Sequence, residues 1–223
     1  MISLRVLGRY VALPAGVALG GVTAAMALAR RSRPLHPRGV VVPVRVVVPD
    51  DVPELGSVGR AGTREAVARV SRAVGLPDQL PDIQGLAVRW YDDDGVPADL
   101  LLSSTGTSLP TRFWLTWRRR PLAGPMTTLL PYTGRTGPVL LGAWPSSAPR
   151  PGGTATLDLA WARPLGPWQV FGRLDVLRPL EASGESPIRF EPAGNAPRGL
   201  PLEPWVASLR HYAYRWARAA YRT

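Results

Sequence analysis

Residues 81–105, PDIQGLAVRWYDDDGVPADLLLSST, predict a β-hairpin. Residues 83–91 and 99–104 are rich in apolar and aromatic side chains and predict two strands, joined by an Asp-Asp-Asp-Gly turn at 92–95. Three adjacent aspartates also resemble the start of a calcium-binding loop, but the later glycine and glutamate positions of such a loop are missing. The aspartates are therefore interpreted as a hairpin turn.

Further strands are predicted on both sides of this hairpin. Residues 39–48, GVVVPVRVVV, form a β-branched run that Pro43 interrupts, which is typical of a strand near an edge or a bulge. Three later stretches are bounded by proline or glycine and predict strands at 138–144, 154–162 and 168–177.

Two other segments bear on the fold class. Residues 63–75 are ambiguous, because a capping threonine and a terminal glycine favour a helix while the alternation of small apolar residues favours a strand. Residues 203–221 contain no glycine or proline after Pro204 and predict a helix. Many short strands followed by a closing helix indicate an α+β chain, built as an antiparallel β-barrel with appended helices.

The composition excludes several kinds of site. The chain has 223 residues, of which 23 are Gly and 25 are Pro, and it has no Cys. Disulfide scaffolds, thiolate metal sites and cysteine nucleophiles are therefore excluded. The two histidines, His36 and His211, are too few for a binuclear metallohydrolase.

The charge is strongly positive. All 27 basic residues are Arg, and the net charge is +11. Such a charge attracts anionic surfaces, but no nucleic-acid-binding motif accompanies it, so no nucleic-acid partner is expected. The run Arg118–Arg119–Arg120 is interpreted as a solvated face, with contact to anionic lipid as the alternative.

Residues 10–29 carry no charge and have arginines on both sides, so they predict a membrane-anchoring helix. A signal peptide ending near Ala25–Met26–Ala27 and an ordinary buried helix are the alternatives. The larger number of arginines after the segment favours a cytoplasmic location for the domain on its C-terminal side. We therefore expect residues 1–32 to be a hydrophobic anchor helix and residues 33–223 to be one barrel domain.

Four collinear segments resemble the haem catalase superfamily, in particular its short catalase-related members. They are 33–39 (RPLHPRG), similar to R-x-x-H-x-K-G; 67–71 (VARVS), similar to V-R-F-S; 81–91 with 99–105, similar to R-D-x-R-G-F-A-V-K-F-Y and D-L-V-G-N-N-T; and 203–214, similar to the closing helix with R-x-x-x-Y. Arg38 stands where lysine is usual, and 113–197 matches only in strand order. The resemblance implies a catalase-like barrel that binds haem.

The resemblance also implies roles for single residues. Tyr214 would be the ligand of the haem iron, with Arg210 one helical turn away keeping the phenolate ionised. His36 would accept a proton from peroxide and return it, as general base and then acid. The remaining implied residues are Ser71, which would fix the tautomer of His36, and Arg33 and Arg69, which would pair with the haem propionates.

One position departs from the family pattern. Ser104 stands where the family has the asparagine that orients peroxide, and serine offers one donor where the amide offers two. Loss of such a group lowers the rate by about 10²–10³. We therefore expect a weak peroxidase acting on hydrogen peroxide or on organic or lipid hydroperoxides. The alternatives are a haem-less, membrane-associated binding or structural protein and, third, a hydrolase such as a phosphodiesterase. An oligomer is left open.

Overall fold

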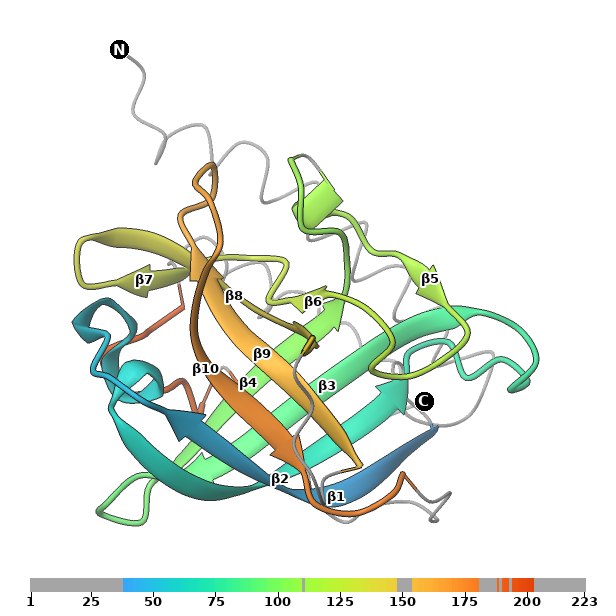
Figure 1. Cartoon of the computed structure of the whole chain (residues 1–223), viewed down its shortest axis with the longest axis horizontal. Coiled ribbons are helices and arrows are strands. Elements are labelled where there is room, and N and C mark those ends of the chain that lie inside the picture. Colours follow the sequence, from blue (N-terminus) through green and yellow to red (C-terminus); the bar gives the residue numbers. More distant parts are fainter. Residues whose placement is uncertain are drawn as a thin grey trace, which may run out of the picture.

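The computed structural model describes residues 38–109, 111–147, 154–180, 188, 190–192 and 194–202. The described part consists mainly of antiparallel strands (Figure 1). These strands are β1 (Arg38–Val48), β2 (Gly62–Arg72), β3 (Asp82–Tyr91), β4 (Pro97–Ser104), β5 (Trp117–Arg118), β6 (Met126–Thr127), β7 (Tyr132–Gly134), β8 (Gly137–Pro145), β9 (Ala155–Ala162) and β10 (Gln169–Val176). Two short 3₁₀ helices, η1 (Pro53–Gly59) and η2 (Thr111–Phe113), lie between strands.

The sheet closes on itself. Its order is β2-β1-β10-β9-β8-β6-β4-β3, and β2 also pairs with β3, so these strands form a barrel without a free edge. The two remaining strands lie outside this ring, β5 paired with β3 and β7 paired with β8. The predicted antiparallel barrel and the strands predicted within it are confirmed. The short strands β5, β6 and β7 and the helix η1 were not predicted.

The ambiguous segment at 63–75 belongs to the strand β2 as far as Arg72, so its helical alternative is wrong. Ala66, Ala68 and Val70 point into the barrel and are 8%, 0% and 5% exposed, and β2 is paired along its length with β1 and over its second half with β3. Two neighbouring strands supply partners for the backbone of β2, and this outweighs the local helix signals.

Pro43 does not mark an edge strand, because β1 lies between β2 and β10. The ladder with β10 runs from Val44 to Val47, so Pro43 lies just beyond its end. Its carbonyl accepts a hydrogen bond from the backbone of Leu177 at 3.1 Å. A proline is tolerated here because the ladder with β10 does not need its missing N–H group.

The predicted turn at 92–95 is confirmed. The backbone N–H of Asp92 donates to Val96, and that of Gly95 donates to Asp92, at 2.9 and 2.8 Å. Gly95 has φ +75°, a conformation that glycine adopts without strain. The hairpin β3–β4 is therefore closed by local backbone hydrogen bonds.

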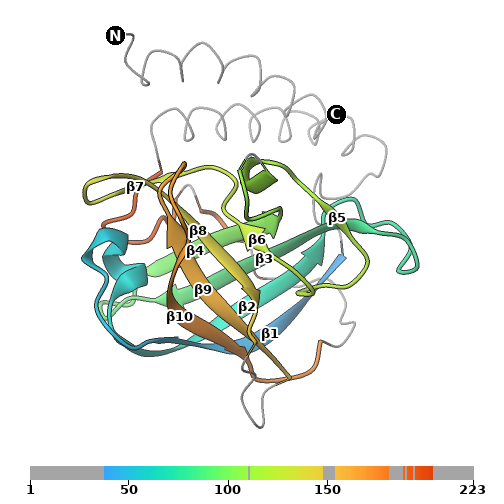
Figure 2. The same cartoon turned by 45° about the horizontal axis from the view of Figure 1, so that its top comes forward.

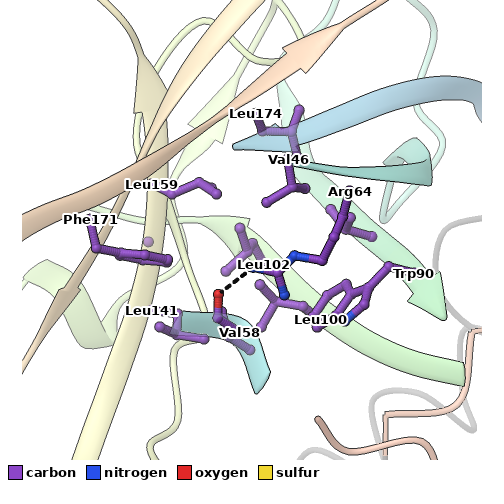
Figure 3. A pocket seen from close by; sticks show the side chains of 12 residues that line it. Val46, Val58, Arg64, Trp90, Leu100, Leu102, Leu141, Leu159, Phe171 and Leu174 are labelled. Carbon is purple, nitrogen blue, oxygen red and sulfur yellow. Dashed lines mark hydrogen bonds between the residues drawn. The ribbon is translucent and has the colours of Figure 1, made fainter. Parts of the chain in front are cut away.

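The barrel interior is packed with apolar side chains around a small cavity of about 20 Å³ (Figure 3). Arg64 reaches its rim, where its guanidinium donates to the carbonyls of Ser57, Val58 and Arg60. Burial lowers the pKa of Arg64. A cavity of this size holds about one water molecule and does not accommodate a larger ligand.

Several predictions lie outside the described residues. These are the anchor helix at 10–29, the domain boundary at 32/33 and the closing helix at 203–221. Within the residues that the structure describes, no helix is long and apolar enough to cross a membrane.

Candidate functional site

The outer face of the barrel carries a row of small residues across four adjacent strands. Gly39 on β1 pairs with Ser71 on β2, Ser71 with Gly85 on β3, and Gly85 with Ser103 on β4. We call these four residues the small-residue row. Residues that pair across a sheet share a face, and the neighbouring Val70, Leu86 and Leu102 point inward, so the row points outward. The result is a flat strip where the backbone is covered by little side-chain volume.

Arg69 lies beside this row and fills the space that Gly39 leaves. A Cβ atom at Gly39 would lie 2.9 Å from Cζ and Nη2 of Arg69 and 2.9 Å from Cβ of Ser71. The guanidinium of Arg69 therefore crosses from β2 to the backbone of β1. Ser71 is 6% exposed although it faces outward. The structure thus brings together two of the predicted site residues, Ser71 and Arg69.

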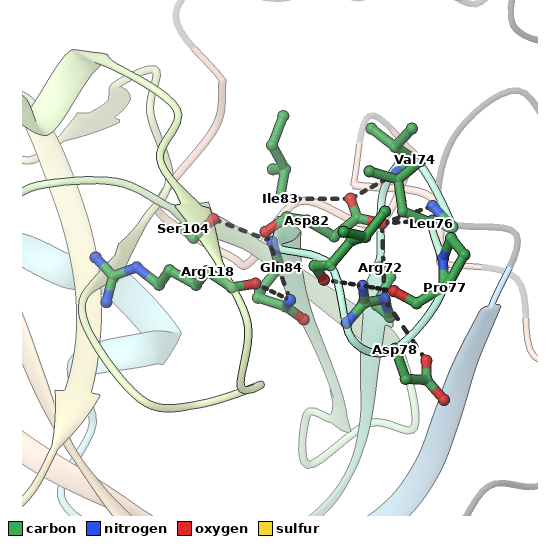
Figure 4. Close-up of polar contacts among 12 residues, drawn as sticks. Arg72, Val74, Leu76, Pro77, Asp78, Asp82, Ile83, Gln84, Ser104 and Arg118 are labelled. Atoms are coloured by element: carbon green, nitrogen blue, oxygen red, sulfur yellow. Dashed lines mark hydrogen bonds and ion pairs between the residues drawn. The ribbon is translucent and has the colours of Figure 1, made fainter.

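Ser104 does not join them. It follows Ser103 on β4, and successive side chains of a strand point to opposite faces, so it lies off the small-residue row. Its hydroxyl donates to the carbonyl of Thr116 at 2.6 Å and accepts from the backbone N–H of Gln84 at 3.0 Å (Figure 4). Ser104 is fully buried, and its hydrogen bonds extend the sheet.

Sequence reasoning missed the part of Ser103 and Gly85 in this arrangement. The residues that lie opposite each other depend on the register of the hairpin, in which Tyr91 pairs with Pro97 and Gly85 with Ser103, one residue away from the register that a four-residue loop at 92–95 would give. The catalytic role predicted for Ser104 stays a prediction, but the serine beside Gly85 and Ser71 is Ser103.

A buried carboxylate fixes the connection that leads from Ser71 to Gly85. Asp82 is 0% exposed and accepts backbone N–H groups from Val74, Gly75, Leu76 and Ile83 at 2.7–3.0 Å (Figure 4). Nε of Arg72 lies 3.7 Å from the same carboxylate. The Arg72 guanidinium also donates to two carbonyls of the connection, at Pro77 and Leu80. All these groups are engaged within the protein, so this cluster is structural.

A second buried ion pair lies on the outer face at the far end of β3 and β4. Arg89 donates to both carboxylate oxygens of Asp99 at 2.6 Å, and Asp99 also accepts from the backbone of Glu191 and the side chain of Asn195. The hydrogen bond to Asp99 raises the pKa of Arg89, whose Cζ also lies 5.1 Å from the ring centre of Phe190. This clasp ties the chain near residues 190–195 to the barrel.

The other predicted site residues, Arg33, His36, Arg210 and Tyr214, lie outside the described residues. Among the residues that are described, no group of three His, Asp or Glu side chains is arranged to hold a metal ion.

The barrel resembles solved structures of other proteins, although its sequence matches no known family. No family model matches the chain, and no curated protein matches it. Solved structures do match: a bacterial catalase with TM-score 0.59 and 12% identity, a fungal catalase with 0.58 and 11%, and catalase A from Saccharomyces cerevisiae with 0.57 and 12%. The barrel has a catalase-like fold.

The overlap is asymmetric. The matches cover 85–88% of this chain but only 57–62% of the catalases, so the chain spans about three fifths of their length. The predicted catalase-like fold is confirmed. At this identity the likeness extends to the fold alone.

Among the described residues, the groups suited to a flat cofactor lie on the outer face of the catalase-like barrel. The interior of the barrel has no room for such a cofactor at its small cavity. The internal cavity of about 20 Å³ excludes a macrocycle. The small-residue row carries no side chain larger than that of serine, and Arg69 supplies a guanidinium beside it, the group suited to paired contacts with a carboxylate.

Proposed function

We propose that the protein is a haem-dependent catalase-like oxidoreductase, a weak peroxidase that acts on hydrogen peroxide or on organic or lipid hydroperoxides. The observation that carries this proposal is the placement of Arg69 and Ser71 beside Gly39 on the outer face of a catalase-like barrel. The lipid hydroperoxide is included because the anchor predicted at 10–29 would keep the site near a bilayer.

The chain connects this outer face to the proposed distal base. His36 precedes Gly39 by three residues, so their Cα atoms are at most about 11 Å apart. In the proposal, the His36 imidazole holds the peroxide proton and returns it to the leaving oxygen. The Ser71 hydroxyl orients that imidazole and fixes which nitrogen carries the proton.

The cofactor would be held by residues from both halves of the chain. Tyr214 would supply the iron ligand, Arg210 would keep its phenolate ionised, and Arg33 and Arg69 would bind the propionates. When bound, haem supplies an iron centre that can take up oxidising equivalents from peroxide. The remaining work of orienting peroxide and moving its proton belongs to side chains of this chain.

The environment of Ser104 favours a second candidate function. Its only proton is donated to the Thr116 carbonyl, so this hydroxyl has no donor left for peroxide. A barrel that has kept the fold and lost haem or catalysis, and that serves as a membrane-associated binding or structural protein, agrees with this observation.

The test is an absorbance spectrum of the full chain expressed with excess haem precursor and purified in mild detergent. We expect a Soret band near one haem per chain. Tyr214→Phe is expected to abolish it, and the matched Tyr212→Phe variant is expected to keep it. His36→Ala is expected to keep haem and to lose peroxide reactivity by about 10²-fold or more.

Two results would count against the proposal. A folded chain that takes up no haem would favour the non-catalytic candidate. A Soret band and a peroxide reactivity unchanged in both Tyr214→Phe and His36→Ala would overturn the assigned residues.

A further inference from the structure

The segment from η2 to β5 exposes large apolar side chains and positive charge together. Trp114 is 70% exposed and Trp117 is 55% exposed. Phe113 and Leu115 beside them are each 37% exposed. The exposed Arg119 and Arg120 follow directly in the chain. We call these six residues the aromatic–arginine loop. Exposed aromatic clusters of this kind mark interaction sites.

Hydrogen bonds to the barrel fix the backbone of this loop, so its exposed side chains are held in place. The backbone N–H of Thr116 donates to Ser104 at 2.8 Å, and the Arg118 guanidinium donates to the carbonyl of Thr105 at 2.6 Å. Gln84 donates to the carbonyl of Arg118 at 2.8 Å. Because the backbone is ordered before any partner binds, binding would not have to order it.

Arg112 joins this loop to the β9–β10 turn. It is 4% exposed and donates to the carbonyl of Gly166 at 2.8 Å, and its Cζ lies 5.1 Å from the ring centre of Trp168. Leu165 in that turn is 79% exposed. Figures 1 and 2 both place η2 and the β9–β10 turn at the same end of the barrel. The turn that carries the exposed Leu165 therefore lies at the same end of the barrel as η2, where the loop begins.

The segment of sequence that contains this loop carries charge of one sign. Residues 100–157 contain no Asp or Glu, so the loop lies in a long stretch whose only charged residues are arginines. Arg112 and Arg118 are engaged with carbonyls, and burial lowers the pKa of each. Arg119 and Arg120 have no ion pair within the described part of the chain. Two arginines thus remain available for an anionic partner.

We propose that the aromatic–arginine loop docks on the surface of an anionic phospholipid bilayer. Tryptophan is favoured at the bilayer interface, where its ring is buried and its N–H group stays hydrated. Adjacent exposed arginines bind the anionic headgroups. The docking uses folded residues of the barrel, so it is separate from the anchor predicted at 10–29 and independent of haem.

The absence of cysteine from the chain makes a position-resolved test possible. The variants Trp114→Cys and Trp117→Cys each carry an environment-sensitive fluorophore on their single cysteine in the full-length protein. The matched control position is Tyr91, which is 62% exposed at the opposite end of β3 from β5. Each labelled protein is reconstituted with vesicles of phosphatidylcholine alone or with phosphatidylglycerol added, containing lipids with a nitroxide in the acyl chain.

We expect quenching and a blue shift at positions 114 and 117 in vesicles with phosphatidylglycerol, and neither at position 91. Replacing Arg119 and Arg120 by Gln should lower the ratio of docked to undocked label by about 30-fold. The matched charge control replaces Arg45 and Arg60 by Gln, since these are already paired with Glu65 and Asp93, and it should change little.

Three results would overturn the proposal. One is equal quenching at all three positions, or none at any. Another is equal quenching at 114 and 117 with and without phosphatidylglycerol, because the arginines would then have no part. The third is protection of the label that rises with protein concentration in the absence of lipid, because a second copy of the chain would then cover the loop.

Discussion

The two faces of β2, β3 and β4 are both partly or fully buried, yet they differ in chemistry. The inner face carries Val70, Leu86 and Leu102, which are 5%, 1% and 3% exposed. The outer face carries the small-residue row and the buried Asp99. The inner face is the ordinary core of a barrel. Buried glycine, serine and aspartate on the outer face show where other groups or segments lie against the sheet.

The largest effect on the free energy of unfolding is expected at Asp99. Replacing this residue tests whether the inner face alone stabilises the barrel. Asp99→Ala removes the carboxylate that accepts both hydrogen bonds from Arg89 and releases the backbone and side-chain donors at Glu191 and Asn195. We expect a loss of about 3–5 kcal/mol in the free energy of unfolding, measured by urea denaturation. Glu65→Ala removes the exposed partner of Arg45 and should cost less than about 1 kcal/mol. If both variants lose the same free energy of unfolding, the ion pair of Arg89 and Asp99 on the outer face adds no stability beyond that of an exposed pair.

A smaller effect is expected at Gly39, and it tests whether the outer face is a binding site. Gly39→Ala places a methyl group where the Arg69 guanidinium and Ser71 now lie, at 2.9 Å. We expect a cost of about 1–2 kcal/mol in stability and a clear loss of haem uptake in a titration followed by absorbance. Val47→Ala on the same strand is the control and should keep haem uptake. If Gly39→Ala takes up haem as fully as the unmodified protein, the small-residue row is not part of the haem site.

The smallest effect is expected at one end of the barrel, where η1 covers the interior. Burial alone would raise the pKa of Glu54, but hydrogen bonds from the backbone and hydroxyl of Thr136 and the charge of Arg163 outweigh it, so the pKa lies below its ordinary value. The ionised carboxylate therefore stabilises the fold above its unfolded-state pKa, and this contribution is lost as the pH falls through the folded-state pKa.

Glu54→Gln should accordingly cost about 1 kcal/mol at pH 7 and less at an acidic pH below the folded-state pKa, by denaturation at both pH values. Glu65→Gln, at an exposed ion pair, is the control and should cost less than about 1 kcal/mol at either pH. A cost for Glu54→Gln that is the same at both pH values would show that packing, and not the charge, is lost.

Much of the barrel could be predicted because its long strands carry their own signals. The β-branched run of β1 and the turn at 92–95 both act locally, so they are visible in the sequence. The strands β5, β6 and β7 have two or three residues each, too few for a periodic pattern. The strand at β2 could not be decided locally, because its partners β1 and β3 decide it.

The candidate site was predictable only in part for the same reason. Ser71 and Arg69 alternate on one strand, so their shared face follows from the sequence once β2 is a strand. The position of Ser103, and not Ser104, beside Gly85 depends on the register between two strands. The four backbone donors around Asp82 depend on the path of a turn-rich connection that has no repeating pattern.

The pairing of β1 with β10 also has a consequence for how the chain is made. These two strands are about 130 residues apart in the sequence, since β1 ends at Val48 and β10 at Val176. A ribosome adding about 5–20 residues per second would leave one side of β1 unpaired for roughly 6–25 seconds. During that interval a valine-rich strand is available to other nascent chains. The newly made protein is therefore expected to depend on chaperones until β10 has emerged.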